Sequence, residues 1–166
     1  MTIATKNQYW NARMTGADPT NPGGNSNDSW SGSGISATAT ITITDFTELN
    51  TGDKVNLVAT DGTNYDFTNG DQSSVNGTWE SATSNNQTAT NLMNVINTSS
   101  GPAGTRFTAT VDGAVVTATQ AISGVDGNTT VTLTDSGTVG MSSTSFTGGV
   151  TGVNISANNL RNTINN

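Results

Sequence analysis

The chain has 166 residues, of which 31% are apolar and only 10% are charged, and its formal net charge is −7. This acidic balance argues against nucleic acid as a partner, because phosphate binding depends on Lys and Arg. The absence of His and Cys excludes Ser-His-Asp and Cys-His catalysis, disulfide bonds, and zinc sites of the ordinary ligand types.

The length fits one domain with flanking segments. Thr, Ser, Asn and Gly replace much of the usual apolar and charged content. Disordered chains also have low hydrophobicity, but they usually carry high charge, which is scarce here. We therefore expect a mainly β fold, a β-sandwich-like sheet of antiparallel hairpins with one packed α-helix, and a modest core that depends on partners for high stability.

Residues 1–35 are expected to form an extended N-terminal arm, because they are rich in Pro, Gly, Ser and Asn and show no hydrophobic periodicity. The arm nevertheless contains Tyr9, Trp10 and Trp30. These aromatic residues either fold back onto the domain or anchor the arm to a neighbouring molecule, since aromatic residues carry much of the binding energy at interfaces. The sequence leaves both interpretations open.

The central domain, residues 36–150, is expected to begin with a strand. From Ala37 to Thr44 the sequence ATATITIT alternates apolar residues with Thr. Successive side chains of a strand point to opposite faces. The alternation therefore predicts one face toward the core and a threonine-covered face toward solvent.

A hairpin follows, and its register can be inferred from the apolar residues. A three-residue loop at 60–62 places both apolar sets on one face, with Gly62 in the left-handed conformation. A two-residue Asp61-Gly62 turn would send one set into water, because a one-residue slip exchanges the faces. The predicted pairs are Ala59–Thr63, Leu57–Tyr65 and Val55–Phe67.

A polar crossing over residues 68–83 contains Trp79. A core position for Trp79 is the favoured interpretation, and the alternative is an exposed ring that stacks on a sugar.

One amphipathic helix is predicted over residues 85–97. Ser84 and Gln87 fit a capping box, and Pro102 lies beyond the point where the helix ends. We expect this helix to lie across one face of the sheet. Its apolar residues recur at helical spacing and form one stripe: Ala89, Leu92, Met93 and Ile96.

A second hairpin is predicted over residues 106–120, with Asp112-Gly113 as a two-residue turn. A strand over 129–134 and a last strand that ends near Phe146 complete the domain. The predicted pairs of the second hairpin are Val111–Ala114, Ala109–Val116 and Phe107–Ala118.

Residues 151–166 are expected to be a C-terminal tail. Leu160 and Ile164 lie one helical turn apart in an Asn-rich setting, so the tail either forms a short docking helix or orders only with a partner. The candidate partner-interface residues are Tyr9, Trp10, Trp30, Leu160 and Ile164.

The carboxylates predict neither a catalytic nor a metal site. Most Asp residues precede Gly or begin turns, which their side chains favour, and none is positioned as one of a catalytic pair. Asp61, Asp66 and Asp71 offer oxygen ligands for calcium, but their spacing departs from the calcium-loop motif. We expect no enzymatic activity, no cofactor and no metal. We also expect no membrane partner, because no apolar run approaches spanning length.

Six segments in order, ATITITD, GDKVNLVATDGTNYDFT, TATNLMNVIN, RFTATVDGAVVTATQ, GNTTVTLT and SFTGGV, span about residues 37–150. In pattern and order they resemble a small β domain of structural proteins in tailed bacteriophages, especially marine and cyanobacterial phages. The resemblance implies a building block of the virion, found in head and tail parts alike.

Within that class, the short acidic domain with an aromatic arm and an Asn-rich tail favours a capsid cement or decoration protein. Such a protein would lie on the outer capsid surface and bind the major capsid protein, and a homo-oligomer, a trimer by analogy with such proteins, is expected. The alternatives are a tail-associated subunit, such as a tube, fibre or knob, and a glycan-binding adhesive module.

Overall fold

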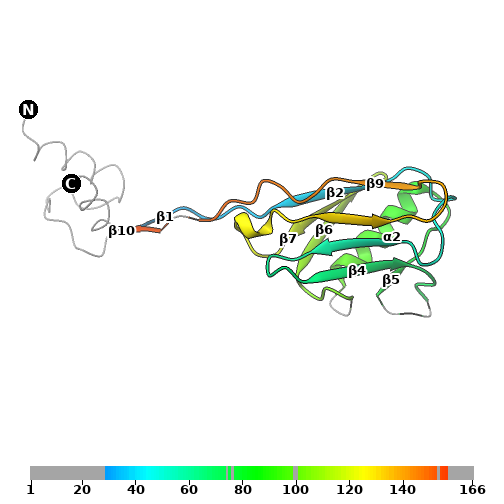
Figure 1. The fold of residues 1–166 in the computed structure, drawn as a ribbon, viewed down its shortest axis with the longest axis horizontal. Coiled ribbons are helices and arrows are strands. Elements are labelled where there is room, and N and C mark those ends of the chain that lie inside the picture. Colours follow the sequence, from blue (N-terminus) through cyan, green and yellow to red (C-terminus); the bar gives the residue numbers. More distant parts are fainter. Residues whose placement is uncertain (1–28, 74, 76, 99–100, 153, 157–166) are drawn as a thin grey trace, which may run out of the picture. The chain divides into compact units, whose positions relative to one another are not determined.

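The computed structural model describes residues 29–73, 75, 77–98, 101–152 and 154–156. The chain divides into a compact domain, residues 34–151, and a second unit formed by residues 1–33 with 152–166. The predicted mainly β fold is confirmed, because the domain holds two four-stranded sheets and one α-helix (Figure 1).

The elements of the described residues follow one another in this order: β1 (Ser29–Ser31), β2 (Thr38–Ile43), β3 (Lys54–Val58), β4 (Asn64–Asn69), β5 (Thr78–Trp79), α2 (Asn85–Asn97), β6 (Phe107–Asp112), β7 (Val115–Gln120), the 3-10 helix η1 (Val125–Gly127), β8 (Val131–Thr134), β9 (Met141–Ser143) and β10 (Asn154–Ser156).

The two sheets of the domain are held together at both of their sides. Sheet I has the strand order β6-β7-β2-β9, and sheet II has the order β5-β4-β3-β8. At one side β8 contacts β9, and at the other α2 contacts strands of both sheets. The helix was expected to cover one sheet face. It instead lies against both sheets, so the core is enclosed between two sheets and a helix.

The predicted alternation of β2 is confirmed. Ala37, Ala39, Ile41 and Ile43 are buried, while the threonines between them lie on the outer side. The largest buried side chains are aromatic, and Phe107 stacks on Phe146 with ring centroids 5.7 Å apart. Ala37 and Ala39 are buried in the same core as these rings, where small side chains leave room for large ones.

The register of the first hairpin is also confirmed. Leu57 pairs with Tyr65 and Val55 pairs with Phe67, while the N–H of Ala59 donates to the carbonyl of Thr63 at 2.9 Å. Gly62 has φ +81°, the left-handed conformation that this loop requires.

The predicted register of the second hairpin is wrong by two residues. Val111 pairs with Val116 rather than Ala114, and Asp112 pairs with Val115, so Gly113 and Ala114 form the turn. Gly113 alone has a left-handed φ, +56°, which is typical of a II′ turn with Gly first. A two-residue shift keeps every side chain on its face, so the apolar pattern does not distinguish the two registers.

The helix spans the predicted residues, and half of the expected capping box forms. The Ser84 hydroxyl accepts from the N–H of Gln87 at 3.1 Å, but the Gln87 side chain donates to Asn91 instead of the cap. Because the helix packs on two sheets, its buried face is wider than the predicted stripe. It comprises Thr88, Ala89, Asn91, Leu92, Val95 and Ile96, with Met93 partly buried beside it.

Candidate functional site

Of the five candidate interface residues, only Trp30 lies in the part of the chain that the structure describes. It belongs to β1, where its backbone pairs with Ile155 of β10 in a two-stranded antiparallel sheet. The other four, Tyr9, Trp10, Leu160 and Ile164, lie outside the described residues. The sequence did not predict β1 or β10, since each has three residues and neither lies in an alternating run.

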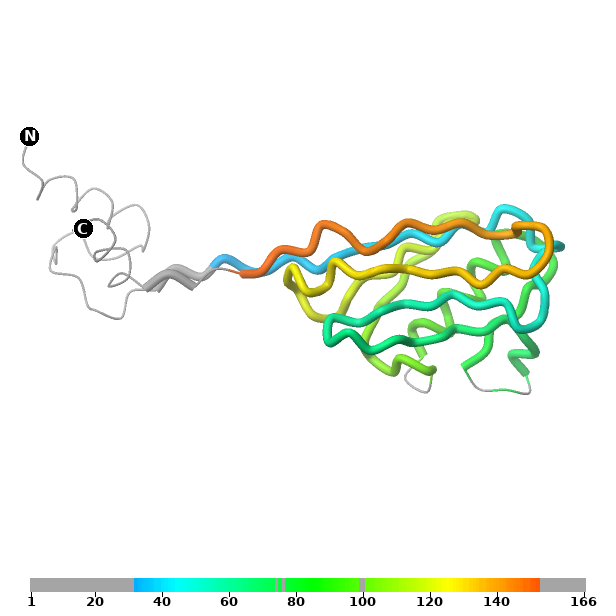
Figure 2. The backbone as a smooth tube through the Cα atoms, viewed as in Figure 1, coloured from blue at the N-terminus to red at the C-terminus, as the bar shows by residue number. Residues whose placement is uncertain are grey.

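Within the domain, the segments that lead to the two termini pair with each other. Ile35 and Val150 exchange two backbone hydrogen bonds of 2.8 and 2.9 Å, and Thr38 and Thr147 exchange two of 2.9 Å. Figure 2 shows these segments, blue and orange, running side by side. We call these two pairs of the domain, Ile35–Val150 and Thr38–Thr147, the terminal ladder. In the second unit, Trp30 pairs with Ile155.

Exposed aliphatic side chains lie on three segments that meet at the end of the terminal ladder in the domain. Ile35 and Val150 are 58% and 48% exposed, and Ile122 and Val125 are 57% and 55% exposed. The backbone connects them: the N–H of Gly124 donates to the Ile35 carbonyl at 3.1 Å. The N–H of Val125 donates to the Thr151 hydroxyl at 3.2 Å. We call Ile35, Ile122, Val125 and Val150 the end patch.

A side chain occupies one position on each edge strand of sheet I. The Asn97 amide donates to the Ala109 carbonyl of β6 at 2.8 Å and accepts from the Ala109 N–H at 2.7 Å, as a neighbouring strand would. On the opposite edge, a carboxylate oxygen of Asp135 accepts from the N–H of Gly140 at 2.8 Å and of Met141 at 3.1 Å. Unpaired edge groups invite strand addition, so these contacts protect the sheet from it.

A polar network holds together the loop before β3 and the loop after β8. The Asp53 carboxylate is buried and accepts from the Ser136 hydroxyl at 2.6 Å, the Ser136 N–H at 2.9 Å and the Asn50 N–H at 2.7 Å. Burial alone would raise the pKa of Asp53, but these hydrogen bonds outweigh it and hold the pKa below its ordinary value. The network therefore fixes the loops with a buried, ionised carboxylate.

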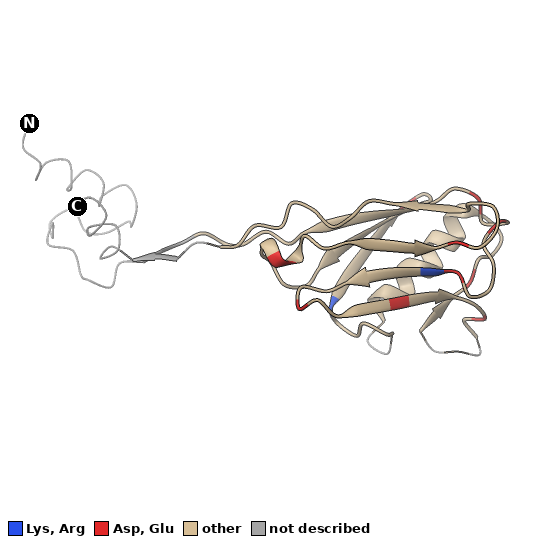
Figure 3. Ribbon diagram, viewed as in Figure 1, with Lys and Arg blue, Asp and Glu red and all other residues tan. Residues whose placement is uncertain are grey.

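The outer faces of both sheets are polar and nearly uncharged. Six threonines of sheet I form two rows across three strands: Thr108, Thr119 and Thr38, then Thr110, Thr117 and Thr40. On sheet II, Lys54 contacts Asp66 at 3.1 Å and both side chains are about half exposed. The remaining charges of the domain are nine acidic residues and Arg106, which pairs with Asp61 at 2.6 Å (Figure 3).

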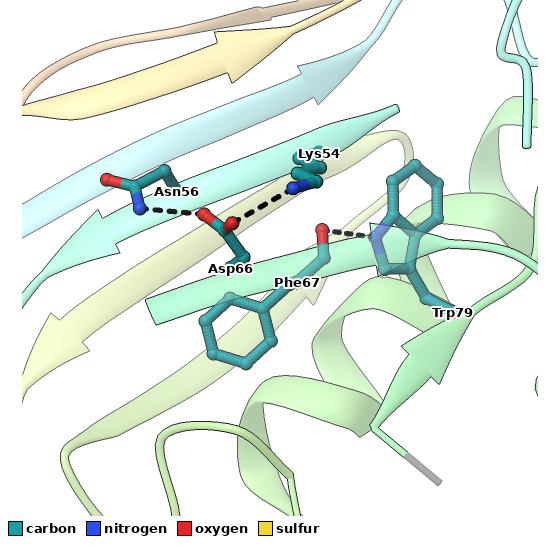
Figure 4. Close-up of polar contacts among 5 residues, drawn as sticks. All are labelled: Lys54, Asn56, Asp66, Phe67 and Trp79. Carbon is teal, nitrogen blue, oxygen red and sulfur yellow. Dashed lines mark hydrogen bonds and ion pairs between the residues drawn. The ribbon is translucent and has the colours of Figure 1, made fainter. Parts of the chain in front are cut away.

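Trp79, considered above as a possible sugar-stacking residue, is part of the core. Trp79 is fully buried, and its indole N–H donates to the Phe67 carbonyl at 3.0 Å (Figure 4). The ring therefore fills the core, as predicted, and it is not available to stack on a sugar.

Two of the three carboxylates considered for calcium have protein partners that lie apart. Asp61 contacts Arg106 at 2.6 Å, and Asp66 contacts Lys54 and accepts from Asn56 at 2.8 Å. The third, Asp71, accepts from the Ser73 N–H and hydroxyl in its own turn. Among the described residues, no three acidic side chains gather as a metal site would require.

No protein-family model matches the sequence, and the search of curated proteins finds no match either. Within the described part of the chain, no helix has the length and apolar character needed to cross a membrane.

Proposed function

We propose that this chain is a virion structural protein, a capsid cement or decoration protein that binds the outer shell through its terminal segments. The observation that carries the proposal is the terminal ladder. Because Ile35 pairs with Val150, and Trp30 pairs with Ile155, the two terminal segments leave the domain together. A chain built in this way has one attachment element made of two strands.

The domain supports this function as a rigid body. Its sheets are closed by α2 and by the β8–β9 contact, and Asn97 and Asp135 each occupy one position on an edge of sheet I. Association by strand addition to sheet I is therefore disfavoured. The terminal segments and the polar outer faces then make the contacts with a shell. The hydroxyl groups of those faces offer many modest hydrogen bonds.

The distribution of charge also supports binding through the terminal segments rather than through the domain. Residues 34–151 hold ten acidic and two basic residues, a net charge of −8, whereas residues 1–33 and 152–166 together hold two acidic and three basic residues, a net charge of +1. Like charge keeps the domains from associating with one another without specificity. The terminal segments, with a net charge of +1, are not subject to this repulsion.

The test compares the full chain with two truncated chains, one lacking residues 1–33 and the other lacking residues 152–166. Each is mixed with shells that lack the protein, and the bound copies are counted after sedimentation. We expect both deletions to abolish most of the binding, because each removes one strand of the β1–β10 pair. Circular dichroism checks that residues 34–151 remain folded.

Binding of the chain without residues 1–33 at the level of the full chain would refute the role of the terminal segments. Imaging of the particle separates the proposal from a tail-associated role. Density for the domain over the whole shell supports decoration, and density only at the tail assigns the chain to the tail.

A further inference from the structure

We propose that the end patch binds the N-terminal segment, residues 1–28, of a second copy of this chain. The inference rests on the proposed function in one respect, because copies on a shell lie next to one another. Four of the six strongly exposed aliphatic side chains among the described residues belong to this patch. The other two, Val75 and Val139, belong to the loops before β5 and β9.

Hydrogen bonds hold together the segments that carry the end patch. Ile35 and Val150 pair through two backbone hydrogen bonds, and the N–H of Gly124 donates to the same Ile35 carbonyl at 3.1 Å. Ile122 and Val125 flank Gly124 in the sequence, so the four exposed side chains lie on neighbouring segments of the domain.

The first fifteen residues have the composition of a ligand for this patch. They include Ile3, Tyr9 and Trp10, together with Lys6 and Arg13, and no acidic residue. Aromatic side chains supply large apolar contact area, and basic residues next to them are attracted by a domain of net charge −8.

One carboxylate is placed to receive such a basic residue. Asp126 follows Val125 in η1 and is exposed beside the end patch. An apolar patch with an acidic neighbour thus complements an aromatic pair flanked by Lys6 and Arg13.

Binding of residues 1–28 from a second copy is more favourable than binding of the chain's own residues 1–28. For its own Trp10 to reach the patch, the chain has to close a loop between Trp10 and Ile35, which costs loop-closure entropy. Neighbouring copies on a shell present their segments at high effective concentration, so they gain the same contacts without that closure. The result is a chain of contacts in which each copy holds the next.

The first test locates the contact directly. A photo-crosslinking amino acid replaces Trp10 in the full chain, and isotopically labelled and unlabelled chains are mixed before irradiation. Mass spectrometry then separates crosslinks between copies from those within one copy. We expect mixed-isotope crosslinks to Ile35, Ile122, Val125 or Val150. Crosslinks within one copy, or between copies but outside the patch, would overturn the proposal.

The second test measures affinity. Ile122→Ser and Val125→Ser together remove the two patch side chains that lie outside the terminal ladder, and Val139→Ser is the matched control, since Val139 is 67% exposed elsewhere. By sedimentation equilibrium we expect self-association of the full chain to weaken about tenfold or more in the double variant and to stay unchanged in the control. Equal self-association of the double variant and the natural chain would refute the proposal.

The two proposals can fail separately. Self-association through the patch without binding to shells would reject the decoration role alone. Shell binding at the natural level, with no loss of self-association in the double variant, would reject the patch contact alone.

Discussion

Replacing Asn97 by Ala tests whether its side chain protects an edge of sheet I. Asn97 belongs to the last turn of α2, and its amide makes two hydrogen bonds with the backbone of Ala109, at 2.7 and 2.8 Å. Ala removes both and leaves the N–H and carbonyl of the edge strand without this partner. The variant should therefore be less stable and more prone to self-association.

The magnitude follows from the two bonds. Each contributes a net stability of about 0.5–1.5 kcal/mol, so their loss costs roughly 1–3 kcal/mol. Ala favours helix over Asn by up to about 0.7 kcal/mol, which offsets part of the loss. A net cost of roughly 1–2 kcal/mol lowers the melting temperature of a domain of this size by about 4–8 °C.

Thermal unfolding followed by circular dichroism measures the change, and light scattering during storage measures self-association. Asn94→Ala is the matched control, because Asn94 is exposed on the same helix and makes the same change in helix propensity. The control should melt at or slightly above the natural protein. If Asn97→Ala behaved like the control in both measurements, the Asn97 contact would have no protective role.

Three further predictions concern the core, the polar network and the surface. Trp79→Phe leaves a cavity and removes the donor to the Phe67 carbonyl, so chemical denaturation should show a loss of roughly 2–4 kcal/mol, and an unchanged midpoint would contradict its core role. Because the folded-state pKa of Asp53 is lowered, its stabilising contribution is present above the ordinary pKa of 3.8 and is lost as pH falls through the lower folded value. Asp53→Asn should therefore be less stable at pH 7 and lose less stability on acidification to pH 2, and parallel pH profiles would contradict this. Lys54→Ala breaks only a half-exposed ion pair, so its stability should stay within about 0.5 kcal/mol at any salt concentration, and a larger loss would show that the pair is structural.

Much of the fold could be predicted because its strands expose one face. The alternation of β2 fixed which side chains are buried, and the first hairpin had only one register that kept Leu57 and Tyr65 on one face. The helix was predictable for a similar reason, since Ser84 caps it and its apolar residues recur at helical spacing.

The errors have physical causes as well. The second hairpin was placed two residues off because such a shift leaves all side chains on their faces. The parallel strand β5 has two residues, so period-two alternation carries no signal there. Pairing of β1 with β10 joins residues more than a hundred positions apart in short serine-containing segments, and no local pattern encodes such a contact.

The candidate site was predicted only in part. Aromatic residues in the arm pointed to the N-terminal segment, but the end patch was not expected. Its four residues come from three separate stretches of sequence, and a single exposed Ile or Val has no local signature. The contact of Asn97 with Ala109 was missed for the same reason, since it depends on how α2 packs against β6.

The terminal ladder also determines how the domain responds to mechanical load. Force that draws the two termini apart opens an antiparallel ladder from its free end, so Ile35–Val150 yields before Thr38–Thr147 and the bonds break one pair after another. When the rest of the domain is held and both termini are drawn in the same direction, β2 and β9 are pulled together, and the load falls along the length of the β2–β7 pairs, so many bonds resist together. The domain should be a weak link when its ends are pulled apart and a strong anchor when they are pulled as one.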